Sequence, residues 1–373
     1  MTVRAREILD WLEDRFPPHW AEDWDAVGLQ VGDAARPVER VGLALEATPE
    51  AVRWALTEQI DLLLCHHPLI FSPLARVATD REPGRTIGQL IRNGVILWVA
   101  HTNLDAAPEG VSTALARRLG LQALRPLEPL DRGLLKMVLF VPVGYEEVVV
   151  QTLRRTPGLG RIGAYDHCSF TVRGEGRFTP DRDTRPFRGD AGRESRVSES
   201  RLEMLVPPAA VPGLLEKLRT VHPYEEMAYD LYPLQGPVPG AGLGRMGVFD
   251  PPLAWEAFIR LLKERTEAPL IQVAGAVPDR VASVAVCGGS GRTAIPSARK
   301  AGVQVLLTGE VGYHPTIECL EAGPVLVTIG HYCSEKWILP ELANLLTGAD
   351  REQGWGVAVK VFLLPGDPYV QSF

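Results

Sequence analysis

The chain contains the stretch Leu62-Leu63-Leu64-Cys65-His66-His67-Pro68, in which an apolar run is followed directly by two adjacent histidines. The apolar run is typical of a buried strand. Pro68 restricts the residue before it to an extended conformation, so His67 is expected to continue from the carboxyl end of that strand. Ligands of open α/β proteins bind outside the carboxyl ends of the strands. The stretch therefore predicts an α/β fold with two histidines where such proteins bind ligands.

Apolar runs and helical patterns alternate through residues 1–130 and again through residues 246–373. In the first segment we expect strands at Val41–Leu45, Ile60–Cys65 and Val95–Ala100, and helices at Pro49–Glu58, Thr86–Asn93 and Val111–Leu119. In the last segment we expect strands at Val281–Cys287, Val303–Leu307, Val325–Ile329 and Val357–Leu363, and helices at Ala294–Ala301 and Lys336–Leu346. Strands that alternate with helices of about ten residues predict βαβ units and mostly parallel sheets.

Residues 133–236 follow a different order: strand, helix, two strands, helix and strand. This β-α-β-β-α-β order is that of ferredoxin-like α+β domains. Turn-rich stretches at Leu124–Gly133 and Gln235–Gly247 flank it, so we expect a domain inserted between the two α/β segments. Within the insert, Arg173–Arg201 is rich in Gly, Arg and Asp without periodicity, and it is expected to form a long surface loop.

The composition excludes several classes of protein. The 373 residues carry a formal net charge of −7 with a pI near 5.7, which argues against direct nucleic-acid binding, because that needs a basic surface. The apolar runs are shorter than the ~18–20 residues of a membrane span, and residues 1–16 carry charges throughout, unlike a signal peptide. Five cysteines at scattered spacings do not suggest a disulfide framework, so a cytoplasmic protein without membrane contact is expected.

Three segments hold four of the eight histidines, and each segment lies where an expected strand ends. Besides the stretch quoted above, they are Val99-Ala100-His101-Thr102-Asn103-Leu104-Asp105 and Ile329-Gly330-His331-Tyr332-Cys333-Ser334-Glu335. Imidazole nitrogens combined with carboxylates suit Zn, Fe, Mn, Ni or Co better than Ca or Mg. Four histidines and two carboxylates exceed the needs of one tetrahedral ion, so we expect two divalent ions that share a carboxylate. The alternative is histidines that form packing hydrogen bonds, but their recurrence at three strand ends favours a metal site.

Two further motifs are open to two interpretations each. The motif Cys287-Gly288-Gly289-Ser290-Gly291-Arg292 lies between a strand and a helix, where its backbone N–H groups would bind a phosphate or its glycines would form a tight turn. Glu310 and His314 follow another strand, and they would either belong to the site, by orienting metal ligands or by reaching substrate, or begin a capped helix. His222, with Glu225 and Glu226, is expected to contribute to packing of the insert or to a contact between subunits.

Several motifs resemble the Nif-three-like family, also called GTP cyclohydrolase I type 2, and the likeness covers essentially the whole chain. In the α/β segments they are Trp24-Asp25-Ala26-Val27-Gly28-Leu29-Gln30-Val31-Gly32, His66-His67-Pro68, His101-Thr102-Asn103-Leu104-Asp105, Thr308-Gly309-Glu310 with His314, and Gly330-His331-Tyr332-Cys333-Ser334-Glu335. The insert is similar to PII or CutA proteins in the motifs Gly160-Arg161-Ile162-Gly163-Ala164-Tyr165-Asp166-His167-Cys168-Ser169-Phe170 and His222-Pro223-Tyr224-Glu225-Glu226. Two positions depart from the family pattern: Ala26 stands where Asn is usual, and Glu46 where Asp is usual.

The resemblance implies a layered α/β fold built from residues 1–130 and 246–373, with a PII/CutA-like domain inserted at 133–236. It also implies a dinuclear metal centre with Glu335 bridging, whose ligands would be His66, His67, Asp105, His331 and Glu335. His101 would lie beside the centre as a further ligand or a proton-transfer group, so His101 and Glu335 are the expected catalytic residues. The family is known for ring-shaped hexamers whose openings the inserted domains cap, so a homo-oligomer of this kind is expected.

Two classes of function are compatible with these residues. In a metal-dependent hydrolase, two divalent ions would acidify a shared water and polarise a carbonyl, imine or phosphoryl oxygen of a small, possibly nucleotide, substrate. The resemblance implies opening of the imidazole ring of GTP with release of formate. In a metal-carrying or regulatory binding protein, the same ligands would hold iron or zinc without turnover. Transfer of metal to an acceptor would distinguish the second class from the first.

Overall fold

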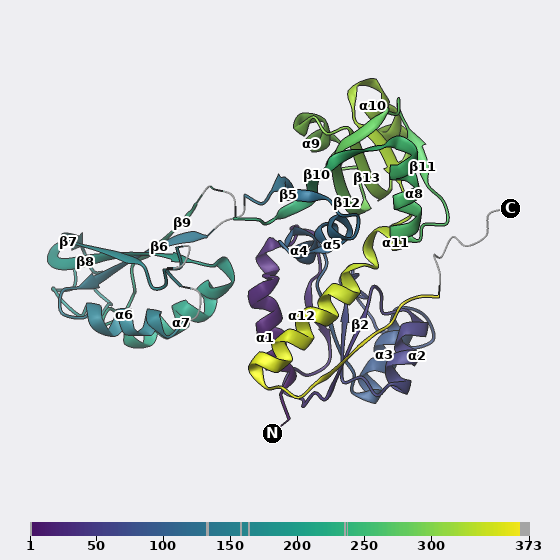
Figure 1. The fold of residues 1–373 in the computed structure, drawn as a ribbon. Helices are drawn as coiled ribbons and strands as arrows, with labels where there is room; N and C mark the ends of the chain where they lie inside the picture. Colours follow the sequence, from purple (N-terminus) through teal and green to yellow (C-terminus); the bar gives the residue numbers. More distant parts are fainter. Residues whose placement is uncertain are drawn as a thin grey trace. The chain divides into compact units, whose positions relative to one another are not determined.

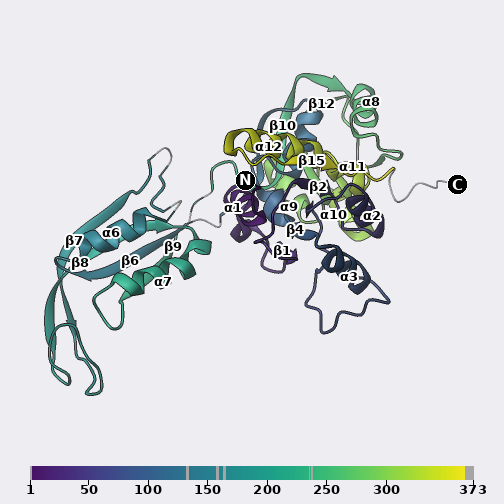
Figure 2. The same cartoon turned by 90° about the horizontal axis from the view of Figure 1, so that it is seen from below.

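The computed structural model describes residues 2–131, 134–156, 159–162, 165–234, 236 and 238–365. The chain divides into two compact units, the first made of Met1–Leu130 and Val238–Phe373 and the second of Asp131–Pro237 (Figures 1 and 2). Gly133, Gly163, Ala164 and Gln235 of the stretches discussed above, and residues 366–373, lie outside the described residues. The second unit is therefore one continuous segment inserted in the sequence of the first.

The first unit contains a five-stranded sheet with the order β1-β4-β3-β2-β15, in which β1 is antiparallel to β4 and the other neighbours are parallel. The strands are β1 (Gly28–Val31), β2 (Arg40–Ala44), β3 (Leu62–Cys65), β4 (Ile96–Val99) and β15 (Ala358–Val361). The mostly parallel sheet expected for this part of the chain is confirmed.

Helices cover both faces of this sheet. Leu62 and Leu64 belong to the same apolar cluster as residues of α1 (Ala5–Arg15) and α12 (Ile338–Gln353). Leu63 packs instead with residues of α2 (Pro49–Thr57) and α3 (Gly84–Asn93). Because successive strand residues point to opposite faces, a strand covered on both sides has to be apolar at every position.

The second sheet of the first unit is mixed, so the expectation of mostly parallel sheets is wrong here. Its order is β11-β14-β13-β12-β10-β5, in which β12, β13 and β14 pair in parallel and the other neighbours are antiparallel. The strands are β5 (Gln122–Pro129), β10 (Gly242–Ala254), β11 (Gln272–Ala274), β12 (Arg280–Ser290), β13 (Val305–Glu310) and β14 (Val325–Thr328). β5 and the start of β10 come from stretches expected to be turns. β5 tolerates Pro126 and Pro129 because it is an edge strand.

The two chain segments of the first unit share one apolar core. That core contains Leu9 of α1 and Leu62 of β3 together with Val284 of β12 and Leu346 of α12. The other helices of this unit that position the site or frame the second sheet are α4 (Thr102–Ala106), α5 (Val111–Arg118), α8 (Trp255–Thr266), α9 (Ala294–Ala301), α10 (Tyr313–Ala322) and α11 (His331–Glu335). In the part of the chain that the structure describes, no helix combines the length and the apolar character needed to cross a membrane.

The second unit has the expected β-α-β-β-α-β order. Its elements are β6 (Leu135–Pro142), α6 (Glu146–Arg154), β7 (Ser169–Phe178), β8 (Ser195–Val206), α7 (Val211–Val221) and β9 (Tyr229–Pro233). They form an antiparallel sheet with the order β7-β8-β6-β9, and α6 and α7 lie together on one face of it (Figure 1). The other face of the sheet carries no helix among the described residues of this unit.

The long surface loop expected at Arg173–Arg201 is confirmed for residues 179–194, whereas both ends of the stretch are strand, so the expectation is wrong there. β7 and β8 pair along their whole length, from Ser169 opposite Met204 to Phe178 opposite Ser195, and the hairpin extends beyond the helices in Figure 2. Most side chains of β7 are exposed, so this strand has no apolar periodicity for a sequence pattern to detect. The main-chain ladder to β8 determines its conformation instead.

Candidate metal centre

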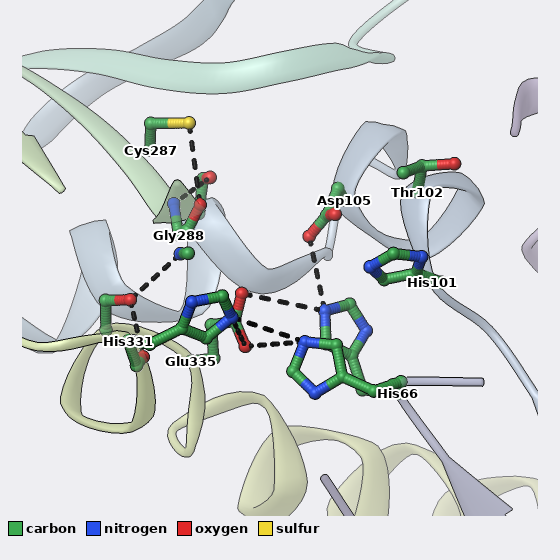
Figure 3. Close-up of polar contacts among 12 residues, drawn as sticks. His66, His101, Thr102, Asp105, Cys287, Gly288, His331 and Glu335 are labelled. Atoms are coloured by element: carbon green, nitrogen blue, oxygen red, sulfur yellow. Dashed lines mark hydrogen bonds and ion pairs between the residues drawn. The ribbon is translucent and has the colours of Figure 1, made fainter. Parts of the chain in front are cut away.

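The three histidine segments meet in the first unit (Figure 3). His66 and His67 follow the last residue of β3, and His101 is the residue before α4. Asp105 lies on α4, whereas His331 and Glu335 are the first and last residues of α11, which follows β14. The centre therefore lies at the carboxyl ends of strands from both sheets, where ligands of α/β proteins bind. All six predicted site residues are brought together there.

The carboxylate of Glu335 occupies the middle of the cluster. One of its oxygens, Oε2, lies 3.2 Å from Nε2 of His67 and 3.2 Å from Nε2 of His331. The other, Oε1, lies 3.9 Å from Nε2 of His66, which in turn is 3.7 Å from Oδ1 of Asp105. Each oxygen of this carboxylate thus faces a different set of donor atoms, as a bridging ligand requires.

Each of the four histidines turns Nδ1 away from the cluster and Nε2 toward it. In each ring Nδ1 faces an acceptor outside the cluster at 2.8–3.0 Å, and the acceptors for His66, His67, His101 and His331 are the Ala100 carbonyl, Glu46, Asp25 and Glu310, respectively. A proton on Nδ1 leaves the lone pair of Nε2 available, and this is the arrangement typical of metal-binding histidines. The surroundings therefore prepare the Nε2 atoms to act as ligands.

Burial of unsatisfied atoms supports a bound cation. His66 is 2% exposed and Glu335 is 4% exposed, and neither His66 Nε2 nor Glu335 Oε2 forms a well-aligned hydrogen bond. Buried polar atoms without partners are costly and rare in native proteins. Ligand atoms of His66, His67 and His101 lie within 4.8 Å of one another, as do those of His67, His331 and Glu335. These donor sets fit divalent transition metals.

Without ions, the cluster is electrostatically polarised. Burial lowers the pKa of His66 to about 3. Burial would also lower the pKa of His67, but its contacts with Glu335 and Glu46 prevail and raise the pKa to about 10. Contacts with Glu310 and Glu335 raise the pKa of His331 to about 11. The ion-free cluster therefore holds protons on two histidines where bound cations would be expected.

The pKa values of the two carboxylates of the cluster are shifted in opposite directions. Burial raises the pKa of Asp105 well above its ordinary value, and the charge of Glu335 adds to this effect. For Glu335, burial is outweighed by His331 and His67, which keep its pKa below the ordinary value. Strongly perturbed pKa values in a cluster of this kind are typical of functional sites.

The glycine motif forms the bulged carboxyl end of β12 and lies against the site. The N–H groups of Gly288, Gly289 and Gly291 donate to Ser112 Oγ, Ser334 Oγ and the Glu310 carbonyl, so they do not face a phosphate. Gly289 has a φ of +62°, and a Cβ there would lie 2.4 Å from Oε1 of Glu335. The phosphate-binding interpretation is therefore not supported, and instead of a tight turn the glycines form a bulge at the end of β12.

Replacing Gly289 by alanine is expected to weaken metal binding by about tenfold or more, because the methyl group displaces the Glu335 carboxylate. Gly302→Ala is the matched control, since Gly302 has a φ of +66° but no atom within 4 Å of the place that the new methyl group would occupy. Both variants carry the same backbone strain, so only the contact differs. Metal retained against a competing chelator measures the effect, and equal retention in the two variants would contradict it.

Sequence reasoning missed part of the supporting shell. Glu310 orients His331, which confirms one of its two interpretations, but His314 makes a ring contact with Tyr313 on α10 instead of joining the centre. Asp25 and Glu46 were not predicted to contact histidines. The available signal was their position inside or beside motifs of the resemblance.

The comparisons with known proteins identify the family of the chain. The family model of Duf34/NIF3 (NGG1p interacting factor 3) matches residues 3–368. The chain belongs to the Duf34/NIF3 family. Among its relatives in this family, a Bacillus subtilis (strain 168) protein named GTP cyclohydrolase 1 type 2 homolog is 32% identical over 369 residues, covering 99% of this chain and 98% of the relative. A Mycobacterium leprae (strain TN) protein of the same name is 36% identical over 381 residues, covering 99% and 96%.

A solved structure extends the family likeness to the fold. The crystal structure of a Bacillus cereus protein related to NIF3 has a TM-score of 0.76 and 33% sequence identity, and the match covers 100% of both chains. The resemblance seen in the sequence motifs is thus confirmed at the level of the Duf34/NIF3 family. The mixed α/β architecture with several sheets is that of this family.

Proposed function

We propose that this Duf34/NIF3 protein is a dinuclear-metal-dependent hydrolase of the GTP cyclohydrolase 1 type 2 kind, acting on a purine-nucleotide-like substrate. The observation that carries the proposal is the buried Glu335 carboxylate, whose two oxygens face separate groups of ligand atoms. The names of the relatives support the same class of reaction.

The proposed cofactors are two divalent ions, for which Zn, Fe, Mn, Ni and Co are the candidates. His66 and Asp105 would hold one ion, His67 and His331 the other, and Glu335 would contact both. When bound, such a pair supplies an acidified water and polarises an oxygen of the substrate. The chain supplies the fixed Nε2 atoms and excludes bulk water from Glu335.

His101 is the proposed proton-transfer residue. Its Nδ1 donates to Oδ1 of Asp25 at 2.8 Å, which leaves Nε2 to accept a proton on the side of the cluster. Burial would raise the pKa of Asp25, but hydrogen bonds from His101 and Thr102 lower it to about 2, so Asp25 stays ionised and holds the ring. The ring can therefore take a proton from the attacking group and deliver it to the leaving group without turning.

The proposal is tested by removing metal from the protein with a chelator, reloading it with each candidate metal, and measuring the formate released from GTP. His101→Gln is expected to keep its metal content and to lose about 10²–10⁴-fold in turnover, the usual contribution of a general acid–base residue. Formate release at the wild-type rate in this variant would refute the role of His101. Metal-loaded wild-type protein that releases no formate from GTP would refute this substrate.

Two exposed rings beside the centre suit a planar substrate. Trp24 is 58% exposed and Phe71 is 54% exposed, with ring centroids 5.8 Å apart. The Trp24 ring also lies 6.0 Å from that of His101. Bases stack on exposed aromatic side chains with a gain of about 1–3 kcal/mol per base. This platform supports a purine-like ring as the part of the substrate next to His101.

Trp24→Ala is expected to raise the KM for a nucleotide substrate by about 5- to 100-fold through loss of stacking, with metal content unchanged. Tyr313→Ala is the control, because Tyr313 is another exposed aromatic residue of the first unit and lies on α10. Steady-state kinetics on both variants separate KM from kcat. A fall in kcat without any change in KM would argue against the stacking role.

A metal-carrying or regulatory protein is the second candidate. His331 is 40% exposed at its side chain and is held by the half-exposed Glu310, so one edge of the cluster faces solvent, as metal exchange requires. Transfer of metal to an apo-acceptor in the absence of nucleotide turnover would favour it. The ring-shaped hexamer and the PII/CutA-like character of the second unit stay predictions; light scattering on the full chain checks the first.

A further inference from the structure

The second unit contains a cavity on the face of its sheet opposite α6 and α7. The cavity has a volume of about 610 Å³, within the range of about 300–1,000 Å³ typical of small-molecule sites. Its floor includes Phe140, Val172 and Arg201, which lie opposite one another on β6, β7 and β8. All of its lining residues belong to the second unit, so this cavity is independent of the metal centre.

Aromatic rings form one side of the cavity. Phe178 and Phe187 each have a ring centroid 6.2 Å from that of Tyr224. The segment between β7 and β8 that carries Phe187 is fastened by the backbone N–H of Arg185, which donates to Glu225 at 3.0 Å. The three rings are thus placed around one space by contacts within the unit.

A buried carboxylate lies among these rings. Glu199 is 9% exposed, and its Oε1 accepts a 2.6 Å hydrogen bond from the Tyr224 hydroxyl. A Cβ at Gly176 would lie 2.0 Å from Glu199 Oε2, so the glycine on the facing strand leaves room for this oxygen in its present position. Glu199 is therefore central to the cavity, and the glycine opposite it leaves space for its carboxylate.

No cation of the chain forms an ion pair with Glu199 in the described residues. Of the two arginines that line the cavity, Arg177 pairs with Glu175 at 3.1 Å and Arg201 with Glu203 at 3.0 Å. The lining has four carboxylates and two guanidinium groups, so its formal charge is negative. A buried carboxylate without a cationic partner is costly, and a bound cation would remove that cost.

We propose that this cavity binds an organic cation, an amine or quaternary ammonium group joined to a flat apolar body. The positive group pairs with Glu199 and lies against the rings of Phe178, Phe187 and Tyr224, which attract cations through their π faces. The apolar body occupies the remainder of the cavity, over Phe140 and Val172. The second unit is thereby a ligand-binding module with a site of its own.

The test uses three probes with one body and different charges: 2-phenylethylammonium, 2-phenylethanol and 3-phenylpropionate. Saturation-transfer NMR and calorimetry on the full chain are expected to show binding of the ammonium compound at least about tenfold tighter than of the other two. Glu199→Gln keeps the shape of the side chain and is expected to abolish this preference. Equal binding of the three probes, or a preference that survives in Glu199→Gln, would overturn the proposal.

A second pair of variants guards against a folding defect in Glu199→Gln. Phe187→Ala removes one ring from the wall of the cavity, whereas Phe170→Ala removes a more exposed ring on the same face of β7, outside the cavity. Only Phe187→Ala is expected to weaken ammonium binding, by about threefold or more. No binding of any probe, together with a change in oligomer mass caused by Phe187→Ala, would mean that a second copy of the chain fills the cavity, and the proposal would be wrong.

Discussion

Glu335→Gln is expected to reduce the metal content of the protein from about two ions per chain to well below one, and to lower turnover by about 10³-fold or more. The carboxylate is central to the cluster, with oxygens 3.2 Å from two histidines and 3.9 Å from a third. An amide offers one neutral oxygen in its place, so it does not hold two cations together. Elemental analysis of protein purified without chelators measures the loss.

The control for this variant is Glu341→Gln, the same chemical change at an exposed position of α12. It is expected to retain wild-type metal content and turnover. Circular dichroism on both variants distinguishes loss of metal from loss of fold. Two ions per chain in Glu335→Gln, or one ion in the wild type, would rule out a centre bridged by this carboxylate.

Metal binding to the metal-free protein at pH 7 is expected to release at least about two protons per chain, since the two histidines each lose one and the raised pKa of Asp105 can only add to the number. The pKa values of His67 and His331 are raised to about 10 and 11 in the ion-free protein, so both rings are protonated at this pH. Metal-bound histidines must be neutral at the ligating nitrogen, hence both protons leave. Because protons compete with the metal, the apparent metal affinity rises with pH, by about a hundredfold per pH unit between pH 6 and 8.

Calorimetric titration in buffers of different ionisation enthalpy counts these protons. His66 contributes none in this range, because burial lowers its pKa to about 3. Glu46→Gln removes a contact that raises the pKa of His67, so this variant is expected to release fewer protons than the wild type. Metal affinity that does not change between pH 6 and 8 would contradict the protonation pattern.

Much of the fold was predictable because local patterns encode it. The apolar run ending at Cys65 predicted β3, and the βαβ alternation predicted the parallel neighbours β2 and β4. These strands are buried on both faces, so their side chains carry a strong signal. The β-α-β-β-α-β order of the second unit was predictable for the same reason, since one face of its sheet packs against helices.

Two of the wrongly expected strands have slight burial, whereas the start of β10 is buried but rich in glycine, which the sequence pattern assigns to turns. β5 and β7 have mostly exposed or half-exposed side chains, and both were expected to be turns or loops in part. The conformation of β5 depends on main-chain pairing with β10, which is far away in the sequence. The conformation of β7 depends on pairing with β8, which follows after a long connecting segment. Such pairing leaves little trace in the side-chain pattern, because every residue except proline has the same backbone donor and acceptor.

The clustering of the candidate site residues was predictable because their three segments each follow a strand and contain residue types that bind metals. Only the tertiary structure showed that His67 and His331, 264 positions apart, lie with their Nε2 atoms 3.4 Å from each other. It also assigned Asp25, Glu46 and Glu310 to the Nδ1 atoms of three histidines. Local sequence determines which elements form, because their periodicity involves near neighbours. The packing of two sheets on a shared core determines which strand ends meet, and therefore which of these residues share a site.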